Sequence, residues 1–400
     1  MRTGVAGFQS GRLKQLRLAF GLTQSGLAEL VGRASGNISK WENGLQAPEA
    51  DAFHRLCEVF GVSQNWLVES PVHSDASSPF FFRSNVTATE TAREIAAIRL
   101  SWLQEISFEL QESLEFPDVN VPCLSEQNCE QISDAEIEQV ASACRQAWGL
   151  GNGPIPHVID IMERAGIVCA RSHLGFLKMD GVSNWCLADD RPYALIIADK
   201  ANGLRNRFDA AHELGHIVLH RHVTQTQYIE KYALLETQAH RFASAFLLPA
   251  ESFCREVRWP TLDTLLALKP RWKVSVAAMV KRCQDLDIIN ETTATRLWKA
   301  RSARGWVKGE PLDDTFQHEL PSLLSQSIKM MVESKVLSRS QLRQVLGLPT
   351  DTLESLCSLE QGYFELPDAA RILKLRLKRQ PISNPSFKKP AQVLGFPAKN

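Results

Sequence analysis

The sequence predicts a multidomain protein: an all-α helix-turn-helix module, then an α+β domain, then a mostly α-helical C-terminal region. Residues 10–69 contain short helical patterns separated by turn residues, which is typical of a small helical bundle. Residues 132–200 alternate amphipathic helices with strand-like runs, and the chain beyond about residue 250 is rich in helices. Because 400 residues exceed what one hydrophobic core usually organises, we expect several domains.

The composition excludes some classes of partner. The 45 basic and 45 acidic residues cancel, so binding to nucleic acid has to come from a local patch. No run approaches the roughly 18 consecutive apolar residues of a membrane span, and the first residues lack the apolar centre of a secretory signal. We therefore expect a soluble, cytoplasmic protein with no membrane partner. The nine cysteines show no CxxC spacing, which predicts reduced and mostly buried thiols.

The N-terminal module is predicted over residues 8–69 and is followed by a linker predicted over residues 70–80. Its pattern predicts five short helices. Thr23 is placed to cap the second helix, and we expect Ile38 and Trp41 to anchor the third helix in the core. The segment from RLKQLR to QNWLV resembles the XRE family of lambda-repressor-like helix-turn-helix regulators. The resemblance implies a DNA operator as a partner.

The resemblance implies that the third helix enters the major groove of DNA and presents its amino-terminal end to the bases. Asn37 is the side chain best able to read a base edge, and Gln24 can reach a phosphate. The module has seven basic and six acidic residues, so we expect modest affinity unless the chain forms a homodimer. The alternative is a module that uses this fold for protein contacts. The predicted DNA contacts are Gln24, Ser35, Gly36, Asn37 and Lys40, with phosphate contact or a solvated face expected of Arg12, Lys14 and Arg17.

The region between the two candidate sites predicts an acidic helix and a small sheet. Residues 101–140 hold ten acidic residues and no Lys or Arg. Glu105, Glu109 and Glu112 lie at helical spacing opposite apolar positions, which predicts a solvated helix face. Further on, the run GVSNWCLADDRPYALIIADK predicts two strands joined by a turn at residues 189–192.

The segment AAHELGHIVLH carries an H-E-x-x-H motif on a predicted helix. His212 and His216 are four residues apart, so their side chains share one helix face at a separation that suits a single cation. Imidazole is a common zinc ligand, and a catalytic zinc site keeps three protein ligands and one water. Glu213 is placed to act on that water. The alternative is a helix with incidental polar residues, but the apolar neighbours predict burial, which is costly for such residues without a metal.

A third ligand is expected from a helix about twenty residues further on. In LLETQAHRFASAFLLP, Glu236 and His240 are one turn apart, and either could bind the metal. The pairing of HELGH with this segment resembles the ImmA/IrrE family of metallopeptidases. The resemblance implies a zincin-like α+β peptidase domain, predicted over residues 81–255, with Glu236 as a zinc ligand. His240 stands where the family usually has Asn or Asp, so it is predicted to orient a ligand or, alternatively, to be one. His220 and His222 are expected at the surface, and the alternative is that one of them stabilises the developing oxyanion.

The rest of the chain is predicted to be helical. A helix-turn-helix-like extension over residues 256–315 is expected to pack on the peptidase domain, with its turn at residues 269–273. A helical C-terminal region is predicted over residues 316–400. From residue 371 onward there are eight basic residues and no acidic ones, which predicts a solubilising tail or a nonspecific phosphate contact.

These features favour a DNA-binding transcriptional regulator with a zinc-dependent endopeptidase domain. Because ImmA/IrrE members cleave repressor proteins, the resemblance implies a repressor or other regulatory protein as the substrate. The edge of the sheet at residues 182–198 is expected to hold this substrate as an added strand. The alternative is a regulator whose peptidase-like domain is a sensor or dimerisation module without significant proteolysis.

Overall fold

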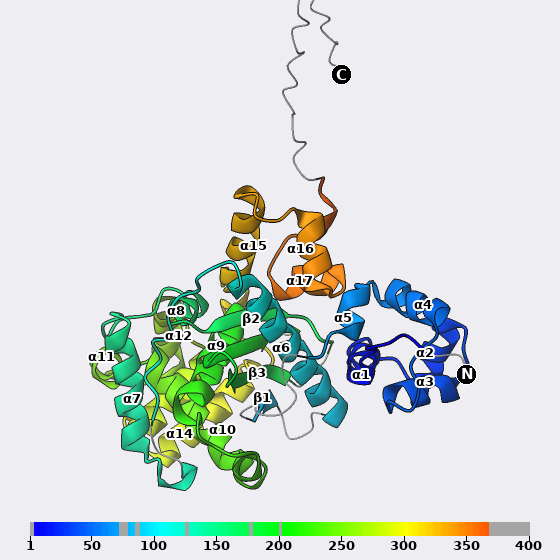
Figure 1. The fold of residues 1–400 in the computed structure, drawn as a ribbon. Coiled ribbons are helices and arrows are strands. Elements are labelled where there is room, and N and C mark those ends of the chain that lie inside the picture. The colour runs from blue at the N-terminus through cyan, green and yellow to red at the C-terminus, as the bar shows by residue number, and fades with distance from the viewer. Residues whose placement is uncertain are drawn as a thin grey trace, which may run out of the picture. The chain divides into compact units, whose positions relative to one another are not determined.

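A computed structural model describes most of the chain (Figure 1). The basic tail predicted from residue 371 and most of the predicted linker lie outside the described residues. Within the described part, no helix is long and apolar enough to cross a membrane. The described residues are 4–71, 79–84, 89–124, 128–175, 179–199 and 202–367.

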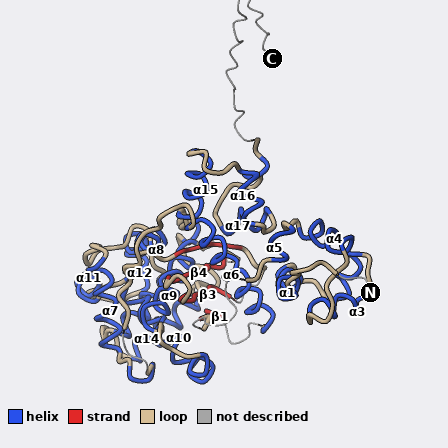
Figure 2. The backbone as a smooth tube through the Cα atoms, in the orientation of Figure 1, coloured by secondary structure: helices blue, strands red, loops and turns tan. Residues whose placement is uncertain are grey.

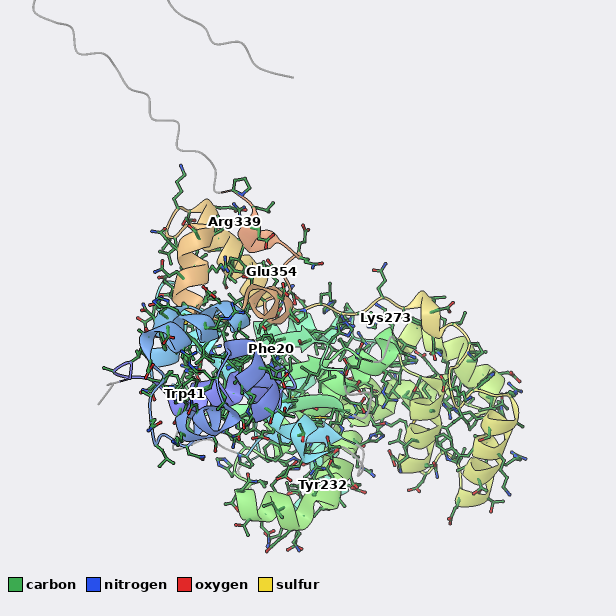
Figure 3. The ribbon with its side chains drawn as sticks, turned by 90° about the vertical axis from the view of Figure 1, so that its right-hand side faces the viewer. Phe20, Trp41, Tyr232, Lys273, Arg339 and Glu354 are labelled. Carbon is green, nitrogen blue, oxygen red and sulfur yellow. The ribbon has the colours of Figure 1, made fainter. Side chains whose placement is uncertain are left out.

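Five short helices form the N-terminal module, as the sequence predicts. Thr23 caps the second helix by accepting a hydrogen bond from the Gly26 N–H, and Gly32 ends it in a left-handed conformation that suits glycine. Ile38 and Trp41 are buried, and Trp41 lies among the helices of the module (Figure 3). The helices are α1 (Ser10–Ala19), α2 (Gln24–Val31), α3 (Ser35–Glu42), α4 (Ala50–Phe60) and α5 (Gln64–Val68).

A four-stranded mixed sheet lies at the centre of the remaining chain (Figure 2). Its strands are β1 (Phe81–Ser84), β2 (Val168–Ser172), β3 (Met179–Cys186) and β4 (Arg191–Ile197), in the order β1-β3-β4-β2. The two predicted strands are confirmed as the antiparallel pair β3 and β4. β1 runs antiparallel along the other side of β3, and β2 runs parallel along β4.

This topology corrects one expectation about the sheet. Most of the length of both strands has no open edge, because β1 pairs with β3 up to Ser183 and β2 pairs with residues 193–197 of β4. The expectation that the sheet at residues 182–198 offers an open edge to a substrate strand is therefore wrong. The segment that forms β1 lies about 100 residues from β3 in the sequence, and its four residues are too few to show a strand period.

Both faces of the sheet are buried, with alternate residues of β4 on opposite faces. Ala194 and Ile196 join the core that contains α9 (Gly203–Leu219), whereas Tyr193 and Leu195 join the core that contains α6 (Glu90–Gln111). The second of these cores also contains the buried residues of α1 to α5. The N-terminal module and the sheet therefore share one continuous hydrophobic core.

A buried ion pair lies within this shared core and corrects two further expectations. Glu105 on α6 is buried, and it accepts hydrogen bonds from the guanidinium of Arg12 and from the Trp66 indole N–H. The acidic face of this helix is therefore not solvated at Glu105, because the N-terminal module packs there. Arg12, which is 3% exposed, is not available to a phosphate.

The other predicted helices are present, with one correction at the predicted turn of the extension. Helix α12 continues through Pro270 to Trp272, and Lys269 is fully buried within it. The turn falls at Lys273, which has a positive φ of 53°. The Lys269 ammonium donates to Glu310, Asp313 and the Pro311 carbonyl. The helices are α7 (Asp134–Ala147), α8 (Val158–Arg164), α10 (Gln225–Leu247), α11 (Ala250–Glu256), α12 (Leu262–Trp272), α13 (Val276–Asp285), α14 (Glu291–Ala303), α15 (Leu323–Glu333), α16 (Arg339–Leu346) and α17 (Thr350–Leu356).

Candidate metal centre

Helix α9 runs between the sheet and α10 and is almost entirely buried. Asn202 caps it by accepting a hydrogen bond from the Arg205 N–H. At Gly215, an added Cβ would lie 3.0 Å from the Ala239 carbonyl oxygen of α10, so a larger residue would push the two helices apart. This close packing brings Glu236 of α10 to the histidines of α9.

Three potential metal ligands converge between these helices. The Nε2 atoms of His212 and His216 are 3.1 Å apart. The Glu236 carboxylate lies 3.1 Å from Nε2 of His216 and 3.5 Å from Nε2 of His212. One ligand atom from each residue lies within 4.8 Å of the others. Both histidines are buried, and a cleft of about 590 Å³, lined in part by His212 and Glu236, reaches the cluster from the surface.

A chain of hydrogen bonds behind the cluster fixes the tautomer of His216. The Gln238 amide nitrogen donates to two backbone carbonyls, those of Cys129 and Ile132. The Gln238 amide oxygen is therefore the acceptor for the Nε2–H of His220, at 3.0 Å. The Nδ1 of His220 must then accept from the Nδ1–H of His216, also at 3.0 Å. As a result, Nδ1 of His216 carries a hydrogen, and the neutral ring presents its Nε2 lone pair to the cluster.

The resulting cluster fits a divalent cation. In that tautomer the Nε2 of His216 faces a carboxylate oxygen of Glu236 at 3.1 Å, and two lone pairs at that distance repel unless a proton or a metal ion lies between them. Burial lowers the pKa of His212, so its ring is neutral. Burial would raise the pKa of Glu236, but its contacts with the two histidines lower the pKa overall, which indicates that the cluster favours one positive charge, a proton or a metal ion, held among these groups. Two neutral imidazoles and one carboxylate form a donor set of catalytic zinc sites.

Glu213 lies beside the cluster, between α9 and β3. Its Oε2 accepts a hydrogen bond from the Ser183 hydroxyl at 2.7 Å, whereas its Oε1 has no partner among the residues that the structure describes. Gly181 makes room for this carboxyl group, because an added Cβ would collide with it. Burial raises the pKa of Glu213 well above its ordinary value. A buried carboxyl group with a raised pKa and a free oxygen can accept and return a proton.

Strand β1 lies directly against the histidines. The Phe81 ring stacks on the His216 ring at a centroid distance of 5.1 Å. The backbone N–H and carbonyl of Phe82 bond to the hydroxyl groups of Tyr228 and Tyr232, so neither group is available to a further strand. Strand β1 therefore shields the cluster on this side, and the open approach is the cleft.

Two sequence-based expectations for neighbouring residues are now settled. The expectation of a surface position is confirmed for His222 and wrong for His220, which is 0% exposed. His220 lies one helical turn after His216, and this spacing could have indicated its position. Gln238, Ser183 and Gly181 were missed because their roles depend on contacts between distant segments.

Two family models match the chain. A helix-turn-helix domain model matches residues 10–67. The Peptidase_M78 model, an IrrE N-terminal-like domain, matches residues 162–284, which include all three potential ligands and Glu213. The chain carries both domains. It matches no curated protein.

Within the IrrE N-terminal-like domain, His240 stays outside the ligand cluster. Its ring packs on Phe208 at a centroid distance of 4.9 Å and lies 6.3 Å from the His212 ring. Burial lowers the pKa of His240 to about 4, so the ring is neutral. In the described part of the chain no hydrogen bond joins it to His212 or Glu236. Its assignment as an orienting residue, or as a ligand, stays a prediction.

The helix-turn-helix domain exposes the amino-terminal end of α3. The predicted DNA contacts Ser35, Gly36 and Asn37 are exposed or half-buried at that end, and Lys40 is exposed in the last turn. The Gln24 amide donates to Glu42 at 2.8 Å, so Gln24 has one donor engaged within the domain. Arg17 pairs with the same carboxylate, whereas Lys14 is exposed and lies 3.9 Å from Glu94. Of Arg12, Lys14 and Arg17 on α1, Lys14 therefore has the side chain most accessible to a phosphate.

Proposed function

We propose that this protein is a DNA-binding transcriptional regulator whose IrrE N-terminal-like domain is a zinc-dependent endopeptidase. The observation that carries the proposal is the cluster of two imidazoles and one carboxylate beside Glu213, whose Oε1 has no hydrogen-bond partner among the described residues. Buried polar atoms without partners cost stability, so a domain used only for dimerisation would be better served by apolar side chains there. A repressor or another regulatory protein is the proposed substrate.

His212, His216 and Glu236 would hold the zinc ion. When bound there, zinc supplies a Lewis acid that lowers the pKa of a coordinated water toward neutrality. Glu213 takes one proton from the attacking water on Oε1 and delivers it to the leaving amine as the C–N bond breaks. The Ser183 hydroxyl holds the other oxygen of Glu213, which fixes the carboxyl group with Oε1 next to Gly181 of β3. The His220 and Gln238 chain holds His216 in the tautomer that can bind the metal.

Substrate access in this proposal is through the cleft, because β1 occupies the edge of β3. Side chains of both charges line the cleft, with Arg83, Arg205 and Lys281 among the basic ones and Asp180 among the acidic ones. Such walls favour an extended polar segment over a folded apolar one. A surface loop or linker of a regulatory protein fits this description.

The activity test uses the full-length zinc-loaded chain and the purified products of neighbouring genes. We expect the wild type to produce a discrete fragment that a chelator prevents. Glu213→Gln should retain zinc and lower cleavage by about 10² to 10⁴-fold, because the proton acceptor is lost. Unchanged cleavage by this variant would contradict the mechanism. Zinc binding without cleavage of any protein or peptide would favour the sensor or dimerisation module instead.

DNA binding has its own test, with the contacts on α3. We propose that Asn37 reads a base edge and that Lys40 contacts a phosphate. Asn37→Ala should relax sequence preference at one position, at a cost of roughly 1–3 kcal/mol. Lys40→Ala should weaken binding to all DNA sequences and reduce the slope of log affinity against log salt concentration by about one. Binding to selected genomic fragments at several salt concentrations, together with the mass of the complex, would also test the proposed homodimer. Unaltered binding by both variants would contradict this docking mode.

A further inference from the structure

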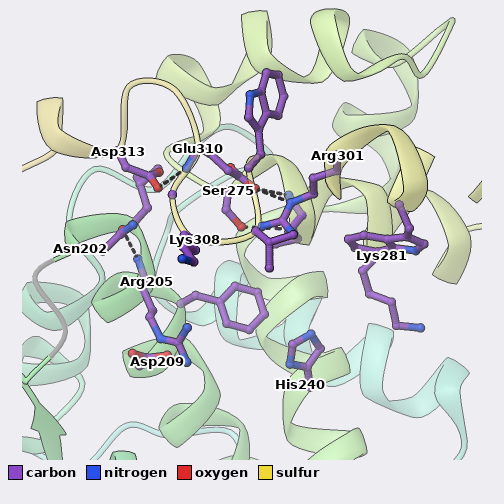
Figure 4. Close-up of a pocket in the computed structure, with 18 of the residues that line it drawn as sticks. Asn202, Arg205, Asp209, His240, Ser275, Lys281, Arg301, Lys308, Glu310 and Asp313 are labelled. Carbon is purple, nitrogen blue, oxygen red and sulfur yellow. Dashed lines mark hydrogen bonds and ion pairs between the residues drawn. The ribbon is translucent and has the colours of Figure 1, made fainter. Parts of the chain in front are cut away.

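A second cavity, of about 400 Å³, opens beside the metal cleft (Figure 4). The two spaces adjoin, since four side chains line both of them. One of these is His240, which stands with Phe208 at the boundary between the cavity and the ligand cluster. The cavity, called the chamber below, is thus the neighbour of the cleft that His212 and Glu236 line. The four shared residues are Arg83, Arg205, His240 and Lys281.

The far wall of this cavity lies outside the match to the IrrE N-terminal-like domain, which ends at residue 284. Trp298 and Arg301 come from α14, and residues 306–310 come from the loop that follows. Phe208 of α9 forms part of the near wall. The interior therefore lies between aromatic side chains of two separate segments. The helical extension does more than pack on the peptidase half, since it completes a chamber next to the candidate metal centre.

Basic side chains outnumber acidic ones in the lining of the chamber, and four of the five pair with carboxylates: Arg83, Arg205, Lys281 and Arg301. The acidic groups there already have partners. Asp209 pairs with Arg83, and Glu310 accepts from the N–H groups at the start of α13 and pairs with the buried Lys269. Lys308 is exposed and forms no ion pair within the part of the chain that the structure describes. A cation entering the chamber would thus meet like charges with no free carboxylate to neutralise it.

We propose that this chamber is the subsite that selects the substrate residue beside the scissile bond, taking a bulky aromatic side chain and rejecting Lys and Arg. The inference rests on the proposed endopeptidase function. The volume holds an aromatic ring, and the walls of Phe208 and Trp298 offer the edge-to-face contacts that such rings prefer. The position fits, because the chamber and the cleft share His240, whose ring lies 6.3 Å from that of the candidate ligand His212.

Cleavage-site profiling with a diverse peptide pool tests the subsite on the full-length zinc-loaded protein. We expect aromatic residues to be enriched, and basic residues depleted, at a single position next to the cleaved bond. Ala277 lines the chamber from α13, so Ala277→Trp should fill it, lower kcat/KM for aromatic substrates by about tenfold or more, and shift the preference to small residues. Ala303→Trp, at the exposed end of α14 outside the chamber, is the matched control and should leave the profile unaltered.

A charge variant and a binding measurement provide independent checks. Lys308→Glu should increase cleavage at basic residues, whereas Lys299→Glu, exposed on α14 outside the chamber, should not.

In the Glu213→Gln background, a fluorescent peptide with one aromatic residue should bind more weakly after Ala277→Trp, by about tenfold, without any turnover. A peptide pool cleaved without aromatic preference, or a profile unchanged by Ala277→Trp, would overturn the subsite and leave the endopeptidase standing. Absence of chelator-sensitive cleavage would contradict the proposed function, and the binding measurement would still decide the subsite.

Discussion

The metal-facing nitrogen of His216 is set by two side chains that do not belong to the ligand cluster. Gln238 is oriented by the backbone of residues 129 and 132, and it orients His220, which in turn orients His216. Burial lowers the pKa of His220 to about 3, so it serves as a neutral acceptor and donor. A ligand held in this way loses little freedom when it binds a metal.

We predict that His220→Ala lowers zinc affinity by about 10 to 100-fold, because the His216 ring loses the partner that fixes its tautomer. Competition with a zinc-binding dye measures the affinity directly. His222→Ala, at an exposed position two residues later, is the control and should bind zinc as the wild type does. Equal affinities for the wild type and both variants would show that the chain does not position His216.

A single histidine far from the cluster should influence stability at acid pH. Burial, followed by nearby Arg171 and His173, lowers the pKa of His318 from its ordinary 6.5. At pH values between the lowered pKa of His318 in the folded chain and 6.5, its value in the unfolded chain, the unfolded chain binds more protons than the folded chain. The contribution of His318 to the free energy of unfolding is therefore complete above pH 6.5 and is lost as the pH falls. The free energy of unfolding of His318→Gln should therefore decrease less below pH 6.5 than that of the wild type. A parallel pH dependence would contradict the shift; His222→Gln is the exposed control.

At the scale of elements, the site depends on how closely β3 approaches α9. Gly181 of β3 has no side chain where Glu213 lies, and Ser183 on the same strand donates to that carboxyl group. The alternation of the strand places both residues on the face that α9 covers. Strand and helix thus hold the proposed proton acceptor from two sides.

Gly181→Ala should displace Glu213 while leaving the three ligands in place. We expect cleavage to fall by about 10²-fold or more with zinc retained, as for removal of a general base. Zinc content and cleavage are measured on the same preparation. Gly153→Ala is a suitable control, since a Cβ at that position meets nothing within 4 Å. Full activity in Gly181→Ala would show that Glu213 has more freedom than the contacts indicate.

At the scale of the whole molecule, the helix-turn-helix domain is built into the same core as the sheet. Arg12 of α1 and Glu105 of α6 form a buried ion pair where the two parts meet, and Trp66 of α5 donates to the same carboxylate. Helix α6 also reaches the sheet, because Gln104 donates to Asn184 of β3. The module that carries α3 is therefore connected to the strand beside Glu213 through one helix.

Arg12→Met should lower the free energy of unfolding by about 3–5 kcal/mol, because it leaves the Glu105 charge buried without its partner. The double variant Arg12→Met/Glu105→Leu should recover most of that loss, since no charge remains to be buried. Urea denaturation followed by circular dichroism measures both. Lys14→Met is the control, because its pair with Glu94 is exposed and 3.9 Å long. A double variant as unstable as the single one would contradict the assignment of the loss to unpaired charge.

The sequence was most informative where one local pattern determines one element. Helix periodicity predicted the five helices of the first module, and the spacing of His212, His216 and Glu236 predicted residues that the structure brings together. It was least informative where burial depends on distant segments. Glu105 had the spacing of a solvated face, His220 followed the motif in an apparently exposed turn, and Lys269 preceded a proline. Each is buried because another segment packs over it.

The central claim is that His212, His216 and Glu236 together bind one zinc ion. Metal analysis of the purified full-length chain, dialysed against a mixture of divalent metals at equal low concentrations, tests it most directly. We predict close to one zinc per chain in the wild type and in Glu213→Gln, and almost none in His212→Ala or Glu236→Ala. A wild-type chain without bound metal, or a Glu236→Ala variant that retains a full equivalent of zinc, would contradict the claim.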